Sequence, residues 1–79
     1  MAGTELHQLV SRMVHVGRLL DSLQGDLFRA AQEATSRGHF PQAEQLRQAQ
    51  QRVAGLMVGV TALTTELRQV AELGRGTRH

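Results

Sequence analysis

Residues 36–41, SRGHFP, divide this 79-residue chain into two long segments that carry the same pattern of apolar residues. On either side of Gly38, apolar residues recur in alternating steps of three and four. This is the heptad spacing of helices that pack along a seam. The first stripe is Leu6, Leu9, Met13, Val16, Leu20, Leu23, Leu27 and Ala30. The second stripe is Leu46, Ala49, Val53, Leu56, Val60, Leu63, Leu67 and Val70.

The two stripes mirror each other about Gly38. If the chain folds back there, Leu9 lies opposite Leu67, and the other members of the stripes pair in the same unbroken register. One uninterrupted antiparallel register predicts an all-α fold, namely a two-helix antiparallel coiled-coil hairpin with its turn at residues 37–40. The whole chain, residues 1–79, is then a single helical-hairpin domain.

Residues with known preferences for helix ends set the expected bounds. Thr4 suits an N-cap, and Gly38 suits the left-handed position that follows many helices. Pro41 suits the first position of a helix, and Gly74 is a stop signal. The expected bounds are about residues 4–36 for helix one, about 41–73 for helix two and 74–79 for a flexible tail.

The composition is that of a small domain with a weak core. The chain has no cysteine, tryptophan or tyrosine, and its aromatic residues are Phe28 and Phe40. A domain of this size buries little apolar surface and commonly needs a disulfide, a metal or a partner. Because the lack of cysteine excludes disulfides and thiolate metal sites, the composition predicts a partner subunit.

The charge balance argues against nucleic acid and membrane as partners. The net charge is +2, and the nine arginines are spread among seven acidic residues. Nucleic-acid binding normally needs a clustered basic face, so it ranks last among the functions considered. The longest uncharged stretch, residues 53–65, is shorter than the about 20 residues of a membrane span. The N-terminus also lacks the pattern of a secretory signal, so we expect a cytoplasmic protein.

Charged residues agree with the predicted register. Beside one edge of the seam, Arg12 is expected opposite Glu66, and Asp26 opposite Arg52. Exposed ion pairs of this kind contribute only about 0.2–1 kcal/mol each, but they disfavour slips of register. We therefore expect this edge to be solvated.

The other flank of the predicted seam carries almost no charge. A two-helix hairpin has nothing of its own to cover such a flank, and contiguous exposed apolar surface commonly marks an interaction site. Alternatively, helix one bends, or a terminal segment folds back over the flank. The expected partner-binding residues are Val10, Val14, Phe28, Ala31, Ala54, Met57 and Thr64.

The sequence shows no spacing typical of a catalytic or metal site. His7 and His15 are too far apart on one helix to share a metal, and no histidine has an acidic neighbour at ligand spacing. The serines have no nearby base, and a two-helix rod offers no concave pocket. We therefore expect no cofactor, no metal ion and no enzymatic activity.

The residues around and after the turn resemble a known family. They are RGHFP at residues 37–41, QLRQAQQR at 45–52, VAGLMVGV at 53–60, and Thr65-Glu66. This pattern, over approximately residues 5–70, resembles the small co-chaperones of type III secretion needle subunits, of the YscE, PscE and AscE type. The tail after Leu73 goes beyond the pattern of that family.

The resemblance implies a role in protein transport. In that family the hairpin protein binds and stabilises a larger tetratricopeptide-like chaperone, which holds the needle subunit monomeric in the cytosol. The partners implied for this chain are that chaperone and, through it, the needle subunit. The resemblance supplies no binding motif at the level of single residues.

Two alternatives remain open. The needle subunit is itself a short helical hairpin, but such subunits usually carry a Pro-x-x-Pro turn, and this chain has a single proline. The second alternative is a self-associating four-helix bundle with an adaptor or structural role unrelated to secretion. Two copies would then meet through their uncharged flanks. When this chain is purified alone, we expect it to be helical but weakly stable, or to form homodimers.

Overall fold

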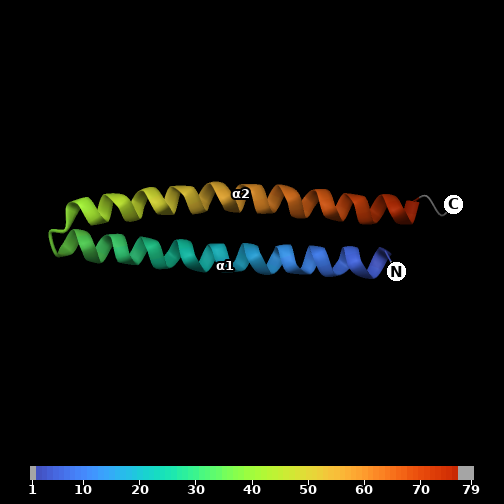
Figure 1. Cartoon of the computed structure of the whole chain (residues 1–79), viewed down its shortest axis with the longest axis horizontal. Helices are drawn as coiled ribbons and strands as arrows, with labels where there is room; N and C mark the ends of the chain where they lie inside the picture. Colours follow the sequence, from blue (N-terminus) through green and yellow to red (C-terminus); the bar gives the residue numbers. More distant parts are fainter. Residues whose placement is uncertain (1, 77–79) are drawn as a thin grey trace.

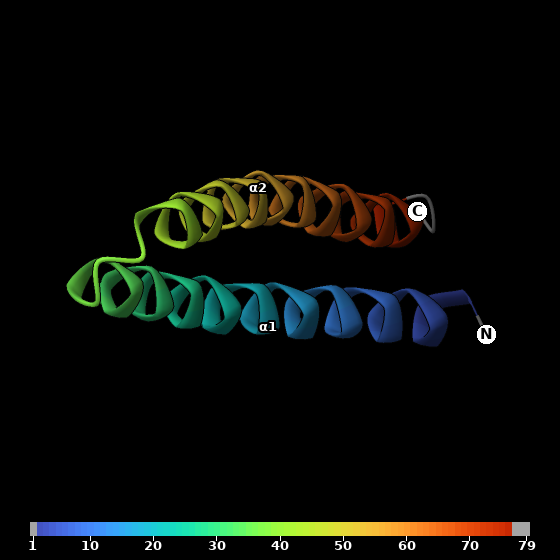
Figure 2. The ribbon, with the colours of Figure 1, turned by 60° about the vertical axis from the view of Figure 1, so that its left-hand side comes forward.

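Two long antiparallel helices make up the described chain. A computed structural model describes the backbone of residues 2–76 and the side chains of residues 5–74. Helix α1 covers Ala2–Ser36 and helix α2 covers Phe40–Gly76. The helices lie side by side, with both chain ends at one end of the molecule and the turn at the other (Figures 1 and 2). The predicted all-α helical hairpin is therefore confirmed.

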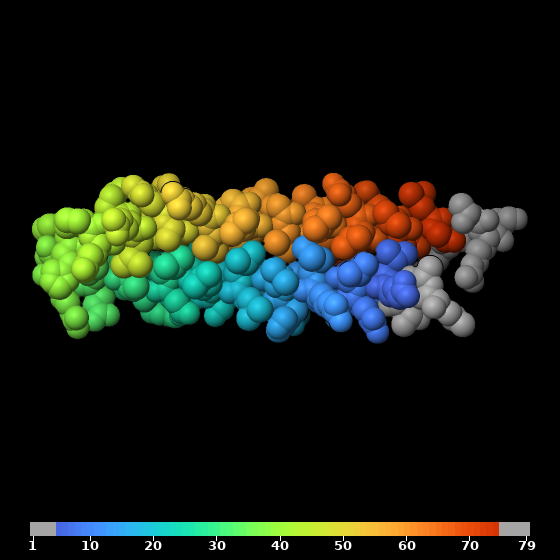
Figure 3. Space-filling view, in the orientation of Figure 1, coloured from blue at the N-terminus to red at the C-terminus, as the bar shows by residue number. Residues whose placement is uncertain are grey.

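The hairpin is a rod and not a rounded domain. Its Cα atoms span 64 × 15 × 11 Å, with a radius of gyration of 18.0 Å. A compact domain of the same length would have a radius of gyration of about 12 Å. The side chains of α1 and α2 meet along the length of the rod (Figure 3). The core is therefore a single seam between the two helices.

Gly38 and two backbone hydrogen bonds form the turn. Gly38 has a φ of 79°, in the left-handed region. Its amide donates to the carbonyl oxygen of Thr35 at 3.0 Å, and the amide of His39 donates to the carbonyl oxygen of Ala34 at 2.8 Å. These bonds form a Schellman motif, which satisfies carbonyl groups that the end of α1 leaves unpaired. The prediction of a left-handed glycine at this position is confirmed.

Helix α2 begins directly after the turn. The carbonyl oxygen of His39 accepts a hydrogen bond from the amide of Ala43 at 3.0 Å, so His39 occupies the N-cap position. Phe40 is then the first residue of α2, and Pro41 is the second, one position later than predicted. Pro41 is still tolerated, because amides in the first turn have no acceptor within the helix.

Both helices are longer than predicted at the open end of the hairpin. The predicted cap Thr4 lies inside α1, and the predicted stop Gly74 lies inside α2, which ends at Gly76. A glycine within a helix costs only about 1 kcal/mol relative to alanine, so it does not by itself end a helix. The rest of the predicted tail, residues 77–79, lies outside the described residues.

The seam between the helices differs from the predicted one. The seam residues of α1, all buried or half-buried, are Leu6, Val10, Met13, Gly17, Leu20, Gln24, Leu27, Ala31 and Ala34. Those of α2 are Ala43, Leu46, Gln50, Val53, Met57, Val60, Thr64, Leu67 and Ala71. Half of each predicted stripe is therefore in the seam, and the other half is replaced by residues of the flank predicted to be uncovered. Leu67, for example, is opposite Val10 and not opposite Leu9.

Small residues lie at several positions of this seam. A Cβ atom added to Gly17 would lie 3.8 Å from Cγ1 of Val60, so the two positions face each other across the seam. Ala31, Ala34 and Ala43 are buried near the turn. The seam is therefore formed by small side chains near the turn and at Gly17.

The fully buried core is small. Thr64 is buried, and its hydroxyl donates to the carbonyl oxygen of Val60 at 2.8 Å, so its polar atom is satisfied. Among the described side chains, the buried apolar ones are Ala31, Ala34, Ala43 and Val53. Because burial contributes about 25 cal/mol per Å² of apolar surface, and the larger apolar residues of the seam are only half-buried, the core stabilises the isolated hairpin weakly.

Replacing Gly38 by alanine is expected to destabilise the hairpin by about 1–2 kcal/mol, because an L-residue in the left-handed conformation costs about this much. No atom lies within 4 Å of a Cβ atom added at Gly38, so the cost is conformational and not a clash. Chemical denaturation followed by circular dichroism measures the change.

Gly55→Ala is the matched control for this substitution. An added Cβ atom at Gly55 also meets nothing within 4 Å, but Gly55 lies inside α2. Its replacement is expected to stabilise the hairpin by about 1 kcal/mol. If Gly38→Ala were as stable as the unaltered chain, the conformation assigned to the turn would be wrong.

Candidate docking face

The seam divides the surface of the hairpin into two faces. In an antiparallel pair of helices, the residue directly after each seam residue in the sequence lies on the same side of the seam in both helices. Two observations show that such residues of α1 and α2 lie close together. Asp21 of α1 and Thr61 of α2, which follow seam residues, line one hollow. The guanidinium of Arg47 donates to the hydroxyl of Thr35 at 3.0 Å, and both residues also follow seam residues.

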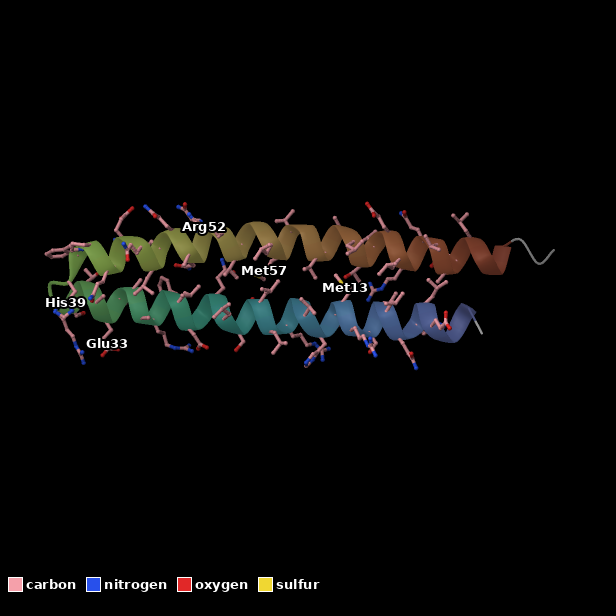
Figure 4. All side chains as sticks on the ribbon, viewed as in Figure 1. Met13, Glu33, His39, Arg52 and Met57 are labelled. Carbon is pink, nitrogen blue, oxygen red and sulfur yellow. The ribbon has the colours of Figure 1, made fainter. Side chains whose placement is uncertain are left out.

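The face formed by residues that follow the seam is polar, and we call it the polar face. Gly17 leaves a shallow hollow of about 300 Å³ on this face. The side chains of Met13 and Met57 extend into the space between the helices beside it (Figure 4). The polar residues that line the hollow are Arg18, Asp21, Thr61, Thr64, Thr65 and Arg68.

The opposite face carries two rows of aliphatic residues. Each of these residues precedes a seam residue, and within each row they are seven positions apart, which places them on one side of their helix. The exposed fraction of the large members ranges from 38% at Val16 to 60% at Leu56. We call this surface the aliphatic face, which consists of Leu9, Val16, Leu23, Ala30, Ala49, Leu56, Leu63 and Val70. Contiguous exposed apolar surface of this kind is typical of interaction sites.

Charged residues border the aliphatic face. Arg12 and Asp26 lie on the outer side of the α1 row, and Arg52 and Glu66 lie on the outer side of the α2 row. The predicted pairs, Arg12 with Glu66 and Asp26 with Arg52, are not ion pairs in the described part of the chain, because the two rows of aliphatic residues separate them. The ion pairs among residues 5–74 are local, and they join Asp26 to Arg29, Glu33 to Arg37 at 2.7 Å and Glu44 to Arg47 at 3.9 Å.

The structure separates the seven predicted partner-binding residues into two groups. Four of them lie in the seam, namely Val10, Ala31, Met57 and Thr64. The prediction that their flank is uncovered is wrong, because each helix covers the residues of the other. The remaining three lie beside the seam on the polar face, and they are Val14, Phe28 and Ala54. Of these three, Phe28 is exposed, at 49%.

The sequence contains a signal for the aliphatic face, namely a third apolar position in each heptad, that the prediction of the seam did not use. Each heptad carries three apolar or small positions in most of both helices, whereas a seam between two helices uses two of them. One row of each helix must therefore lie outside. The prediction placed the row of Leu9, Val16 and Leu23 inside, but the structure leaves this row outside and places the row of Val10, Gly17 and Gln24 in the seam.

Three further findings concern metals, membranes and relatives. Within the described residues, no group of three or more histidine, cysteine, aspartate or glutamate side chains could hold a metal ion. Over the same residues, neither helix combines the length and the apolar character that crossing a membrane requires. No known protein family, curated protein or solved structure matches the chain.

The neighbouring residues Met57 and Leu56 provide a test of which row lies inside. Met57→Asp is expected to destabilise the hairpin by about 2–4 kcal/mol, because it places an unpaired charge in the seam. Leu56→Asp on the aliphatic face is expected to change stability by less than about 1 kcal/mol. Urea denaturation of both variants in dilute solution measures the difference. Equal loss of stability in the two variants would contradict the seam.

Proposed function

We propose that this chain is a docking subunit that presents its aliphatic face to a larger helical protein and stabilises it. The observation that carries the proposal is the continuous double row of exposed aliphatic side chains, bordered by charges and backed by a small core. The proposed role is binding alone, without catalysis.

The shape of the aliphatic face suits a helical partner. Each row covers three heptads, so the face is about 32 Å long at about 1.5 Å per residue. A partner helix lying along the two rows would turn the two-helix hairpin into a bundle of three or more helices. The docked helix would contribute the second layer that the hairpin lacks.

Docking would also offset the weak core. The six large side chains of the aliphatic face are about half exposed. Covering the exposed half of each contributes about 1 kcal/mol per side chain before the costs of association. Such a gain is comparable with the whole stability of a small domain, which is about 5 kcal/mol or less. Binding and folding are therefore expected to be strongly coupled.

The resemblance of the turn and of the glutamine-rich start of α2 to the needle-subunit co-chaperones suggests the partner. On this proposal, the aliphatic face binds a tetratricopeptide-like chaperone in the cytoplasm, and that chaperone holds the needle subunit of a type III secretion system monomeric. Repeat proteins of this kind stack helix pairs into solenoids with extended concave binding surfaces, which suit an elongated partner. The protein is then a co-chaperone in protein transport.

Co-expression with candidate partners tests the proposal. Genes for a needle subunit and a tetratricopeptide-like protein are expected beside the gene for this chain, and the chaperone is expected to co-purify with it. Leu63→Asp, on the aliphatic face, is expected to weaken this binding by at least about 100-fold, because it buries an unpaired charge at the interface.

Val58→Asp is the matched control for Leu63→Asp. Val58 is 72% exposed and lies on the polar face of the same helix, whereas Leu63 is 44% exposed. The control is expected to bind as the unaltered chain does, and both variants should keep their helical circular dichroism. Loss of binding with Val58→Asp alone would place the interface on the polar face. If the neighbouring genes have no relation to secretion, the assignment of the chaperone fails, while the docking face stands.

A further inference from the structure

The charges that border the aliphatic face are arranged in opposite order along the two helices. On α1, Arg12 lies near the open end of the hairpin and Asp26 lies nearer the turn. On α2, which runs the other way, Glu66 lies near the open end and Arg52 lies nearer the turn. The face is therefore bordered by one cation and one anion along each helix. Its open end and its turn end also have one cation and one anion each.

The aliphatic residues are smallest at the turn end of the face. Leu9 and Val70 form the end of the face near the open end of the hairpin, and Ala30 and Ala49 form the end near the turn. A copy turned end for end places its bulky open end against the small side chains of the turn end.

We infer that a second copy of this chain docks on the aliphatic face, turned end for end about a two-fold axis. The axis crosses the face at the level of Leu19 on α1 and Gly59 on α2. These residues are midway between the border charges of their helices, seven positions from each. The inference rests on the charges and the shape of the face, and not on the proposed chaperone partner.

Within the length of the face, this rotation matches charge with opposite charge along both edges. Arg12 meets the partner's Asp26, and Arg52 meets the partner's Glu66, and each contact occurs twice because the interface is symmetric. Beyond the ends of the face, the rotation brings Glu5 opposite the partner's Glu33, which is already paired with Arg37 of its own chain. In the described part of one chain, Arg12, Arg52 and Glu66 take part in no ion pair. The carboxylate of Asp26 pairs with Arg29 of the same helix and can still accept further hydrogen bonds.

At the ends of the face, the same rotation matches a large side chain with a small one, because Leu9 meets the partner's Ala30 and Val70 meets the partner's Ala49. In the middle, large side chains meet each other, as Val16 meets the partner's Leu23. The face is about 32 Å long and about 20 Å wide across two helices, so the contact would bury roughly 600 Å² per copy. The total of roughly 1,200 Å² reaches the lower limit of stable protein interfaces. The product is an antiparallel four-helix bundle.

Sedimentation equilibrium of the purified chain is the first test. We expect a monomer–dimer equilibrium, and we expect Leu63→Asp to shift it strongly to the monomer. Arg12→Glu is expected to raise the dissociation constant about tenfold, because two contacts change from attraction to repulsion. Arg18→Glu, which alters a charge on the polar face, is the matched control and is expected to leave the equilibrium unchanged.

A charge exchange then tests the orientation. Adding Asp26→Arg to Arg12→Glu restores opposite charges across the proposed interface, so the dissociation constant is expected to return toward its original value. Adding Glu66→Arg should give no rescue, and circular dichroism checks that each variant remains helical. Rescue by Glu66→Arg and not by Asp26→Arg would overturn the proposed rotation. A chain that sediments as a monomer at about 1 mM would overturn the dimer itself.

Discussion

The rotation of each helix about its own axis, which decides the residues that enter the seam, is the constraint on which the rest of the structure depends. A Cβ atom at Gly17 would meet Val60 at ordinary van der Waals distance, and Ala34 and Ala43 are buried on either side of the turn. In this rotation Val10, Gly17 and Ala31 enter the seam in place of residues from the neighbouring row. The leucines and valines of the neighbouring rows then have to lie outside. The aliphatic face is therefore a direct consequence of how the helices pack, and not a separate feature of the surface.

The fold and the turn could be predicted from the sequence because several local signals agree. Heptad spacing, Gly38 and Pro41 all favour two helices joined at one place, and the Schellman motif forms at the glycine that the pattern indicates. Consistency among independent local signals is what makes a sequence specify one fold. The helix ends at the open end of the rod were less predictable, because Thr4 and Gly74 are weak signals in long helices.

The docking surface could not be predicted in the same way. Apolar positions occupy a band of each helix that is wider than one seam. Two arrangements that differ by a small rotation of each helix about its own axis therefore both bury a complete stripe of residues. Spacing alone does not distinguish them, and a preference for burying large side chains selects the wrong one. The structure leaves Leu56 exposed at 60% and places its neighbour Met57 in the seam. The predicted ion pairs between the helices did not distinguish the two arrangements either, since exposed ion pairs contribute too little free energy to fix a register.

Use of one face by both a second copy and a chaperone would make the two bindings mutually exclusive. The apparent affinity for the chaperone would then fall by the fraction of chains held in the dimer, and the dimer would dissociate as the chaperone accumulates. Such competition would keep much of the aliphatic face covered, which would limit nonspecific association of exposed leucines. It would also reconcile the two occupants considered for this surface, because either one would add a second layer to the small core of the hairpin, and the relative concentrations would decide which one binds.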